Sequence, residues 1–503
     1  MQDAGHRTAG KTDSMENMAL KDFGNMNDTE GRENMDGLQI ARREGGPGGR
    51  TIAAISTAQA PGGIGVIRIS GPRALETADR VFFSAGGKKI SGQKGYTVLY
   101  GEVRELSSGE KLDEALATCF RAPRSFTGED VAELSCHGGL YILRRVLKEV
   151  YAAGASPAEP GEFTRRAFLN GKIGLTEAES VMELISAQGA GAARAAMAGH
   201  EGVLEKRIRS LRERLVGLAA HLDAWADYPE EDIEEVTGDA LERSLAEASE
   251  EIGRLLSSFE TGKILREGVD TVIAGRPNAG KSTLMNLLSG CERSIVTDVA
   301  GTTRDIVEET VLLGDIPLRL ADTAGLRFTE DPVESIGVEK ARQRLASAGL
   351  ILAVFDSSCE LNEEDRELIN ACRGVPSVAV INKSDLESKM DYSYIRESFR
   401  HSVVISALSG DGLAELSREV TDLLRTGALD PDEGILFTER QRDAARRAGE
   451  GVEEARQALR MGMTLDAVTV SLEGAVSALL ELTGERASEA VVEQVFAHFC
   501  VGK

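Results

Sequence analysis

The chain has 503 residues, a formal net charge of −24 at pH 7 and an ordinary hydrophobic fraction of 42%. This length exceeds what a single core fills, so we expect about three domains. The negative charge argues against broad electrostatic binding of nucleic acid, so an RNA contact would need a local basic patch or a basic partner.

The sequence shows neither a membrane signal nor an export signal. No apolar run approaches the roughly 20 residues that span a bilayer, and the first residues lack the short apolar core of a secretory signal. The six cysteines are scattered without a CxxC pair, which favours a reducing compartment over disulfides or structural zinc. We therefore expect a cytoplasmic protein with no membrane segment.

Residues 1–50 are polar and rich in Gly, Asn, Asp and Glu. A segment with so few apolar side chains buries too little surface to order itself. We expect either a disordered extension without a function or a start codon placed too far upstream, with Met35 as the alternative start.

Residues 51–168 mix strand-like and helical patterns and predict a small α/β domain. Alternation within this segment places Glu133 on the face opposite Ala132 and Leu134. That carboxylate either faces solvent or holds a ligand, and the spacing alone does not decide between the two. The expected strands are 51–55, 65–70, 116–120 and 131–135, and the expected helix is 140–153.

Residues 169–262 and 431–503 are both helical in pattern, with apolar positions recurring every three or four residues. Pro229 and the acidic run 230–232 interrupt the first segment. Neither segment makes a complete domain, so we expect one discontinuous bundle into which residues 263–430 are inserted.

The insertion contains GRPNAGKS at 275–282, between a strand-like run and a helical one. This order is typical of a loop that cradles phosphates. Gly275 and Gly280 let the backbone turn tightly beside the oxygens, and the N–H groups of the following helix favour an anion. Lys281 would reach the terminal phosphates, and Ser282 would bind Mg2+.

Four further elements follow in the order of a GTP switch protein. GTTRD at 301–305 supplies hydroxyls for Mg2+ and the terminal phosphate, and DTAG at 322–325 supplies a carboxylate and a sensing N–H. In NKSD at 382–385, Asp385 can accept two N–H bonds from guanine that adenine does not offer. A backbone N–H in 406–408 would meet the guanine oxygen. Together the five elements predict a Ras-like P-loop GTPase domain that binds GTP.

The residue that orients the attacking water is not the usual one. Many small GTPases place a Gln directly after DxxG, but Leu326 follows Gly325 here. An acidic residue further on, or a partner, must do this work. The nearby candidates, which spacing does not rank, are Glu330, Asp331, Glu334 and Glu339.

Asn278, inside the phosphate loop, is also unusual. Its side-chain oxygen either binds a monovalent cation beside the phosphates, doing electrostatically what an arginine finger does, or bonds within its own loop.

Several motifs resemble the MnmE (TrmE) family of tRNA-modification GTPases. They are GRPNAGKS, TDVAGTTRD, DTAGLR, VESIG, GGIGVIRISG, SFTGEDVAELSCHGG, PGEFTRRAFLNGK, YPEEDI and the final FCVGK. The resemblance runs from Thr51 to the end of the sequence. It implies a multidomain α/β plus α fold: an N-terminal folate-binding and dimerising α/β domain, a discontinuous helical bundle ending in the CVGK motif, and an inserted GTPase domain.

The resemblance implies a K+-stimulated GTPase that hydrolyses GTP when its nucleotide domains dimerise. Motif match makes Glu334 the residue that orients water and Lys281 a second catalytic residue, with Ser282 and Thr303 on Mg2+. The implied K+ ligands are Asn278, Thr297, Val299 and Thr302. The predicted GTP-binding set is Asn278, Ala279, Gly280, Lys281, Ser282, Thr283, Thr297, Asp298, Val299, Ala300, Gly301, Thr302, Thr303, Asp322, Thr323, Ala324, Gly325, Asn382, Lys383, Asp385, Ser406, Ala407 and Leu408.

The resemblance also implies a tetrahydrofolate one-carbon donor, as the 5-formyl or 5,10-methylene derivative. Cations suit the carboxylates of folate, and a carboxylate suits the paired N–H groups of its pterin. The matched positions are Arg68, Glu133, Lys172 and Lys503. Cys500 is either catalytic or a packing residue.

The family works as a homodimer with the flavoprotein MnmG, which uses FAD and NADH, in a heterotetramer. Together they add an aminomethyl or carboxymethylaminomethyl group to C5 of the wobble uridine, U34, of certain tRNAs.

Three positions depart from the family pattern. Ala60-Pro61 stands where many members have Gly-Arg, and Gly174 replaces an Asp whose loss should loosen the next helix by removing its cap. Arg440-Gln441 replaces an Arg-His pair. None of these positions belongs to the GTPase motifs. Two rival hypotheses remain: a GTPase that guides ribosome assembly, and a folate enzyme with a regulatory GTPase.

Overall fold

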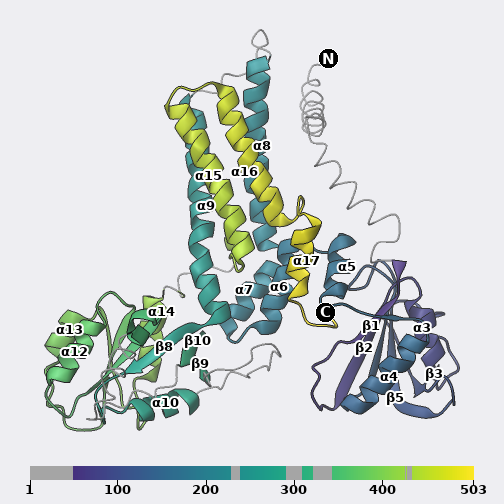
Figure 1. Ribbon diagram of the computed structural model, residues 1–503, viewed down its shortest axis with the longest axis horizontal. Coiled ribbons are helices and arrows are strands. Elements are labelled where there is room, and N and C mark those ends of the chain that lie inside the picture. The colour runs from purple at the N-terminus through teal and green to yellow at the C-terminus, as the bar shows by residue number, and fades with distance from the viewer. Residues whose placement is uncertain (1–48, 228–237, 291–308, 321–342, 425, 427–432) are drawn as a thin grey trace, which may run out of the picture. The chain divides into compact units, whose positions relative to one another are not determined.

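The computed structural model describes residues 49–227, 238–290, 309–320, 343–424, 426 and 433–503 (Figure 1). They form two compact units. The described residues within Met1–Glu179, Ile208–Ala248 and Glu450–Lys503 make up the N-terminal unit, and those within Ser180–Arg207 and Ser249–Gly449 make up the central unit. The predicted extension 1–50 lies outside the described residues except for its last two.

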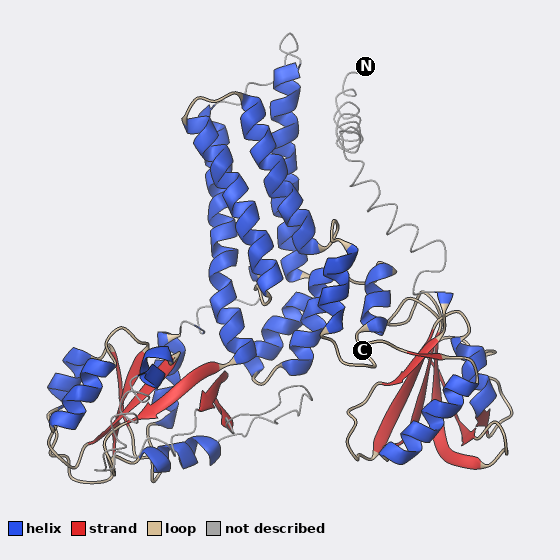
Figure 2. Ribbon diagram, in the orientation of Figure 1, coloured by secondary structure: helices blue, strands red, loops and turns tan. Residues whose placement is uncertain are grey.

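The N-terminal unit contains a seven-stranded sheet in the order β3-β4-β5-β6-β2-β1-β7. All pairs in it are antiparallel except β1 with β7. The helices α3 (Ala74–Val81) and α4 (Leu140–Ala152) cover one face (Figure 2). The strands are β1 (Ile52–Ile55), β2 (Ile64–Ser70), β3 (Phe82–Ser84), β4 (Thr97–Arg104), β5 (Lys111–Phe120), β6 (Val131–His137) and β7 (Ser156–Pro157).

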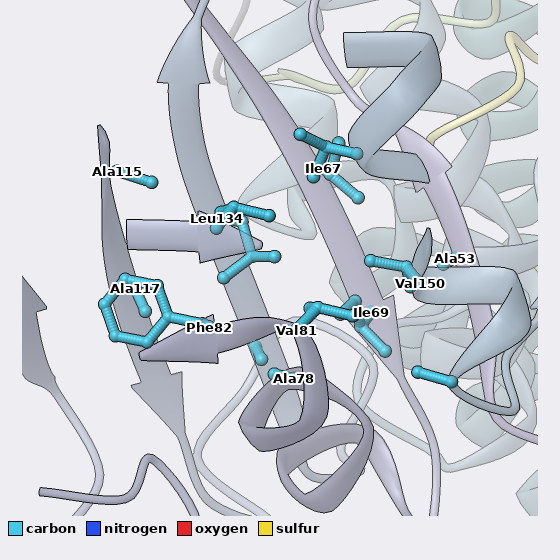
Figure 3. Packing of buried hydrophobic residues seen from close by; sticks show 14 of the residues in the cluster. Ala53, Ile67, Ile69, Ala78, Val81, Phe82, Ala115, Ala117, Leu134 and Val150 are labelled. Carbon is cyan, nitrogen blue, oxygen red and sulfur yellow. The ribbon is translucent and has the colours of Figure 1, made fainter. Parts of the chain in front are cut away.

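The core of this unit lies between the sheet and the two helices (Figure 3). Alternate residues of the strands, such as Ile67 and Leu134, point into it and meet Val81 and Val150 of the helices. Because side chains alternate along a strand, the same alternation leaves Glu133 partly exposed on the other face, as expected.

Five further helices belong wholly or partly to the N-terminal unit. They are α6 (Leu175–Ser186), α8 (Val203–Asp227), α9 (Gly238–Glu267), α15 (Glu439–Arg460) and α16 (Leu465–Thr483). Arg456 of α15 pairs with Glu242 of α9 at 3.0 Å. The helical pattern of both sequence segments is therefore confirmed, and segments far apart in sequence pack together.

The central unit contains a six-stranded sheet in the order β13-β12-β11-β8-β10-β9. Only β9 is antiparallel to its neighbour. The strands are β8 (Val269–Ala274), β9 (Glu309–Leu313), β10 (Ile316–Leu320), β11 (Leu350–Asp356), β12 (Ser377–Asn382) and β13 (His401–Val404). The helices are α7 (Ala190–His200), α10 (Lys281–Gly290), α12 (Glu363–Ala371), α13 (Tyr392–Ser398) and α14 (Leu413–Leu423).

Two separate apolar clusters sandwich the central sheet. Ile273 and Leu352 pack with Leu284 of α10 on one face, whereas Ile351 and Ile381 pack with residues of α12 and α13 on the other. Strands buried on both faces need no polar alternation, which is why the central strands β11 and β12 are nearly continuous apolar runs.

Several boundaries differ from the sequence expectations; the strand expected at 116–120, for example, begins at Lys111. The helix predicted to end near Gly262 continues to Glu267, because Gly262 lies against the backbone of Leu436, where a Cβ would be 2.4 Å from the carbonyl oxygen. The glycine permits close packing there and does not end the helix. Arg50, assigned to the extension, is held by Glu159 and Glu162, each at 3.2 Å.

The described cysteines Cys119, Cys136, Cys359, Cys372 and Cys500 form no disulfide. Burial raises the pKa of Cys136 and of Cys372 to about 12, so these two thiols stay protonated at neutral pH. Among the described helices, none combines the length and the apolar character that crossing a bilayer requires.

A buried ion cluster fixes α5 (Glu162–Leu169) to the sheet. Arg166 pairs with Glu162 at 2.8 Å and with Glu129 at 3.0 Å, and only 1% of the Arg166 side chain is exposed. Removing one member of a buried ion cluster leaves its partners uncompensated, which is strongly destabilising.

Arg166→Met should lower the free energy of local opening around α5 by about 3–5 kcal/mol, because the partly buried Glu129 loses the Arg166 cation and the buried Glu162 keeps only Arg50. Hydrogen exchange of peptides from α5 and β6 in the full chain measures this change. Arg104→Met is the matched control, since Arg104 pairs with Glu102 on the surface and exposed pairs contribute little. Unchanged exchange in the Arg166 variant would show that the cluster contributes no stability.

Candidate functional site

The parallel strands of the central unit bring their carboxyl ends to one edge of the sheet. β11 lies between β8 and β12, with Ala353 opposite Ala274 and Asp356 opposite Asn382. The loops that follow β8 and β12 are therefore neighbours, and this edge is where open α/β sheets bind ligands. The structure thus brings together three of the five predicted elements, at 275–282, 382–385 and 406–408.

The phosphate loop follows β8 with little space around its glycines. A Cβ on Gly275 would lie 2.5 Å from the carbonyl oxygen of Val354, and one on Gly280 would lie 2.1 Å from Nδ2 of Asn382. Gly280 also has a φ of +98°, which favours glycine. These contacts explain both glycines of the motif.

Lys281 begins α10 and is held by the loop itself. Its Nζ donates to the carbonyl oxygens of Gly275 at 2.7 Å and Arg276 at 2.9 Å. Burial lowers the pKa of Lys281, so the ammonium would gain from an anion beside it. The first N–H groups of α10 would favour the same anion.

Asn382 joins the phosphate loop to the segment 406–408. It is 2% exposed; its Nδ2 donates to the carbonyl oxygen of Ala279, and its Oδ1 accepts from the N–H of Ala407, each at 2.9 Å. The Ser406 hydroxyl donates to Oδ1 of Asp385 at 2.7 Å, which orients the carboxylate assigned to guanine. The exposed Leu408 follows these residues.

Several predicted positions lie outside the described residues. They are Thr297, Asp298, Val299, Ala300, Gly301, Thr302, Thr303, Asp322, Thr323, Ala324, Gly325 and Glu334. Of the implied ion ligands, the structure therefore describes Asn278 for K+ and Ser282 for Mg2+. Both side chains are exposed at the phosphate loop, and Asn278 has a φ of 62°.

A second cluster of predicted residues lies in the N-terminal unit. Arg68 of β2 and Glu133 of β6 are cross-strand partners, with Nε of Arg68 2.8 Å from Oε1 of Glu133. The guanidinium lies over the rings of Phe126, at 5.3 Å, and Phe163, at 5.7 Å. Sequence reasoning did not single out these two rings, although both lie in motifs that carry the family resemblance, SFTGEDVAELSCHGG and PGEFTRRAFLNGK.

The CVGK motif is threaded into this same region. Val501 bridges to Pro160, and the carbonyl oxygen of Lys503 accepts from the N–H of Phe163 at 3.2 Å. Gly502 has a φ of +99°, and a Cβ there would lie 2.3 Å from the carbonyl oxygen of Ile55. Only glycine fits this turn without strain.

Three charged side chains, those of Arg68, Glu133 and Lys503, lie in the region that residues 501–503 enter. Burial and the charge of Arg68 lower the pKa of Lys503, while Glu133 acts in the opposite direction. Arg68, Glu133 and Lys503 are therefore together, as the resemblance implied. Lys172 instead donates to the carbonyl oxygen of Pro123 at 3.1 Å, and Cys500 is exposed.

Two departures from the family pattern have local replacements. The N–H of Gly174 donates to Oε2 of Glu177 at 2.8 Å, so one of the two bonds of a capping box is present at the start of α6. Gly174 has no side chain to accept the other bond, and the expected loosening stays a prediction. Gln441 is 1% exposed, and its Oε1 accepts from the N–H groups of Phe437 and Thr438 at 2.8 and 3.3 Å.

Two family models match the chain. "GTP-binding protein TrmE N-terminus" matches residues 51–172, and "MnmE helical domain" matches residues 175–500. A Symbiobacterium thermophilum protein named tRNA modification GTPase MnmE is 46% identical over 459 residues, covering 91% of this chain and all of that protein. An Acetivibrio thermocellus protein of the same name is 41% identical over 90% of this chain and 99% of its own length.

Solved structures resemble the chain only in part. A variant of Aquifex aeolicus Era bound to GDP.AlF4− is 28% identical over 36% of this chain and 66% of that one. Its TM-score of 0.24 is too low to support a structural argument.

Asn382→Ala should weaken the binding of guanine nucleotides about 10- to 100-fold, because it leaves a buried carbonyl and a buried N–H unpaired. Fluorescence titration with a labelled GDP in Mg2+ measures the Kd. Asn370→Ala, on the exposed surface of α12, is the matched control. Equal affinity of the two variants would remove Asn382 from the nucleotide site.

Proposed function

Because the chain belongs to the MnmE family of tRNA modification GTPases, we propose that it hydrolyses GTP to drive the modification of tRNA at C5 of the wobble uridine. The observation that carries this proposal is the identity of 46% along the full length of a relative of that name. The convergence of the phosphate loop and the base-reading loop at one sheet edge supports the nucleotide half of the proposal.

In this proposal GTP binds at that edge. Asp385, oriented by Ser406, accepts the paired N–H groups of guanine, and Lys281 and the start of α10 hold the phosphates. A hydroxyl suits Mg2+ and a neutral amide oxygen suits K+, so the exposed Ser282 and Asn278 fit these ions. Glu334 orients the water, while Thr303 completes the Mg2+ ligands, and Thr297, Val299 and Thr302 those of K+.

We assign the cluster of Arg68, Glu133 and Lys503 to a tetrahydrofolate derivative, which would supply the one-carbon unit. Glu133 offers a carboxylate for the pterin N–H groups, and the two cations suit the carboxylates of its glutamate tail. The rings of Phe126 and Phe163 add apolar surface beside Arg68. Lys172 joins this set if its exposed ammonium leaves Pro123. Cys500 stays a candidate for the chemistry.

A partner completes the proposed reaction. The net charge of −24 disfavours extensive tRNA contact by this chain alone, which supports a role for the flavoprotein MnmG with FAD and NADH. The proposed assembly is a homodimer that forms a heterotetramer with MnmG. It acts where tRNA is found, in the cytoplasm.

Deletion of the gene should remove the aminomethyl or carboxymethylaminomethyl group from C5 of U34, because no other step of the proposal adds it. Mass spectrometry of digested tRNA measures these nucleosides. Complementation with the wild-type gene should restore them, whereas Lys281→Ala should not. An unchanged profile, together with co-sedimentation of the protein with ribosomal particles, would favour ribosome assembly instead.

Replacement of K+ by Na+ at constant ionic strength should lower kcat for GTP at least about tenfold, because the smaller ion fits the ligands of K+ poorly. Phosphate release measures the rate. Asn278→Ala should reduce the rate in K+ to the rate in Na+, with Asn370→Ala again as the control. Equal rates of the wild-type protein in both salts would overturn the cation role of Asn278.

A further inference from the structure

Asp356 ends β11 at the same sheet edge, although it belongs to none of the five GTP elements of the sequence. It is 5% exposed. Its Oδ2 accepts from Nζ of Lys383 at 2.7 Å, and its Oδ1 accepts from the N–H and the hydroxyl of Ser358 at 3.0 and 2.6 Å. Asp356 therefore pairs with Lys383 of the NKSD motif, although Asp356 itself lies outside that motif.

The same carboxylate faces the phosphate loop. Nη2 of Arg276 lies 4.0 Å from Oδ2 of Asp356, and Nε of Arg276 lies 3.9 Å from Oδ1 of Asp365. The Asp365 side chain is fully buried. Its Oδ2 accepts from the N–H of Asn362 at the start of α12, whereas its Oδ1 has no hydrogen-bond partner among the described residues. Arg276 is therefore the cation that balances Asp365.

The four side chains form a row of alternating charge: Lys383, Asp356, Arg276 and Asp365. A buried charge is tolerated when an opposite charge lies beside it. Burial acts to raise the pKa of Asp356, but hydrogen bonds from Lys383 and Ser358 outweigh it and hold that pKa below its usual value. The Asp356 carboxylate is therefore ionised at neutral pH.

Lys383 needs such support because of its backbone. Its φ of 64° lies in the left-handed region, where a residue with a side chain is strained. Two contacts from the end of β11 hold it there: the Asp356 carboxylate and the Ser357 hydroxyl, which donates to the Lys383 carbonyl oxygen at 3.0 Å. Arg276 lies two residues before Asn278, and its own carbonyl oxygen accepts from Lys281.

We propose that Asp356 is a positioning residue for guanine-nucleotide binding, holding the base-reading loop through Lys383 and the phosphate loop through Arg276. This role rests on the proposed binding of GTP at the same edge. Asp356 touches neither guanine nor phosphate in this role. Asp356 sets the distance between the two loops that touch the guanine and the phosphates. Its loss therefore weakens nucleotide binding but leaves the chemical step unchanged.

The test compares Asp356→Asn with the wild-type full-length chain. The Kd for labelled GDP and the KM for GTP should each rise about tenfold, the change expected when one buried ionic partner is lost. The kcat at saturating GTP should stay within about twofold, because the groups assigned to the chemical step are unchanged. Asp356→Glu should recover part of the affinity because it restores the charge.

A double-mutant cycle tests the connection to Lys383. Asp356→Asn and Lys383→Met should be non-additive in the Kd, because both break the same contact. Asp270→Asn is the matched control. Asp270 pairs with Arg319 at 2.8 Å on the same sheet but contacts neither loop, so this variant should bind GDP as the wild type does.

Several outcomes would overturn the proposal. These are a wild-type Kd in Asp356→Asn, additive effects in the cycle, or a parallel fall of kcat, affinity and melting temperature, which indicates general destabilisation. If Asp356→Asn does not fold, Arg276→Lys and Arg276→Gln decide: the first keeps the charge and should bind normally, and the second should not. Failure of the wild-type chain to bind GTP would instead refute the proposed function.

Discussion

The nucleotide site depends on the two hydrogen bonds that the side-chain amide of Asn382 makes. One edge of a parallel sheet brings three loops close together, but closeness alone does not fix their spacing. Asn382 does so by bonding the phosphate loop with its nitrogen and residue 407 with its oxygen. Gly280 is a glycine partly because this amide lies where its Cβ would be. The residue types at positions 280 and 382 therefore depend on each other, although the two positions are far apart in the sequence.

The sequence predicted local features more fully than contacts between segments. The strands β1, β2 and β6, the helical segments and the phosphate loop follow from periodicity and glycine placement, and the structure has them close to the expected positions. The helical pattern was expected to reach only residue 262, whereas α9 continues to Glu267, and the close contact of Gly262 with the distant Leu436 was not predictable from local sequence. Local propensity loses there to tertiary packing.

The candidate sites were predictable to different degrees. Spacing identified Lys281 and Asn382, since short motifs carry their chemistry locally. Asp356 was missed because a single carboxylate at the end of an apolar strand matches no motif, and its importance arises from Lys383 and Arg276. Phe126 and Phe163 lie in quoted motifs but were missed, because only the fold places their rings beside the distant Arg68. For Arg68, Glu133 and Lys503, the prediction came from family resemblance, because no spacing rule joins residues so far apart in sequence.

The threading of Val501, Gly502 and Lys503 between β1 and α5 has a consequence for biosynthesis. While the protein is being translated, its amino-terminal sheet emerges from the ribosome long before these residues do. A nascent chain can therefore form that sheet and its apolar core, with Arg68 and Glu133 already paired, before Lys503 is made. The cluster of Arg68, Glu133 and Lys503 is completed only when synthesis has reached Lys503.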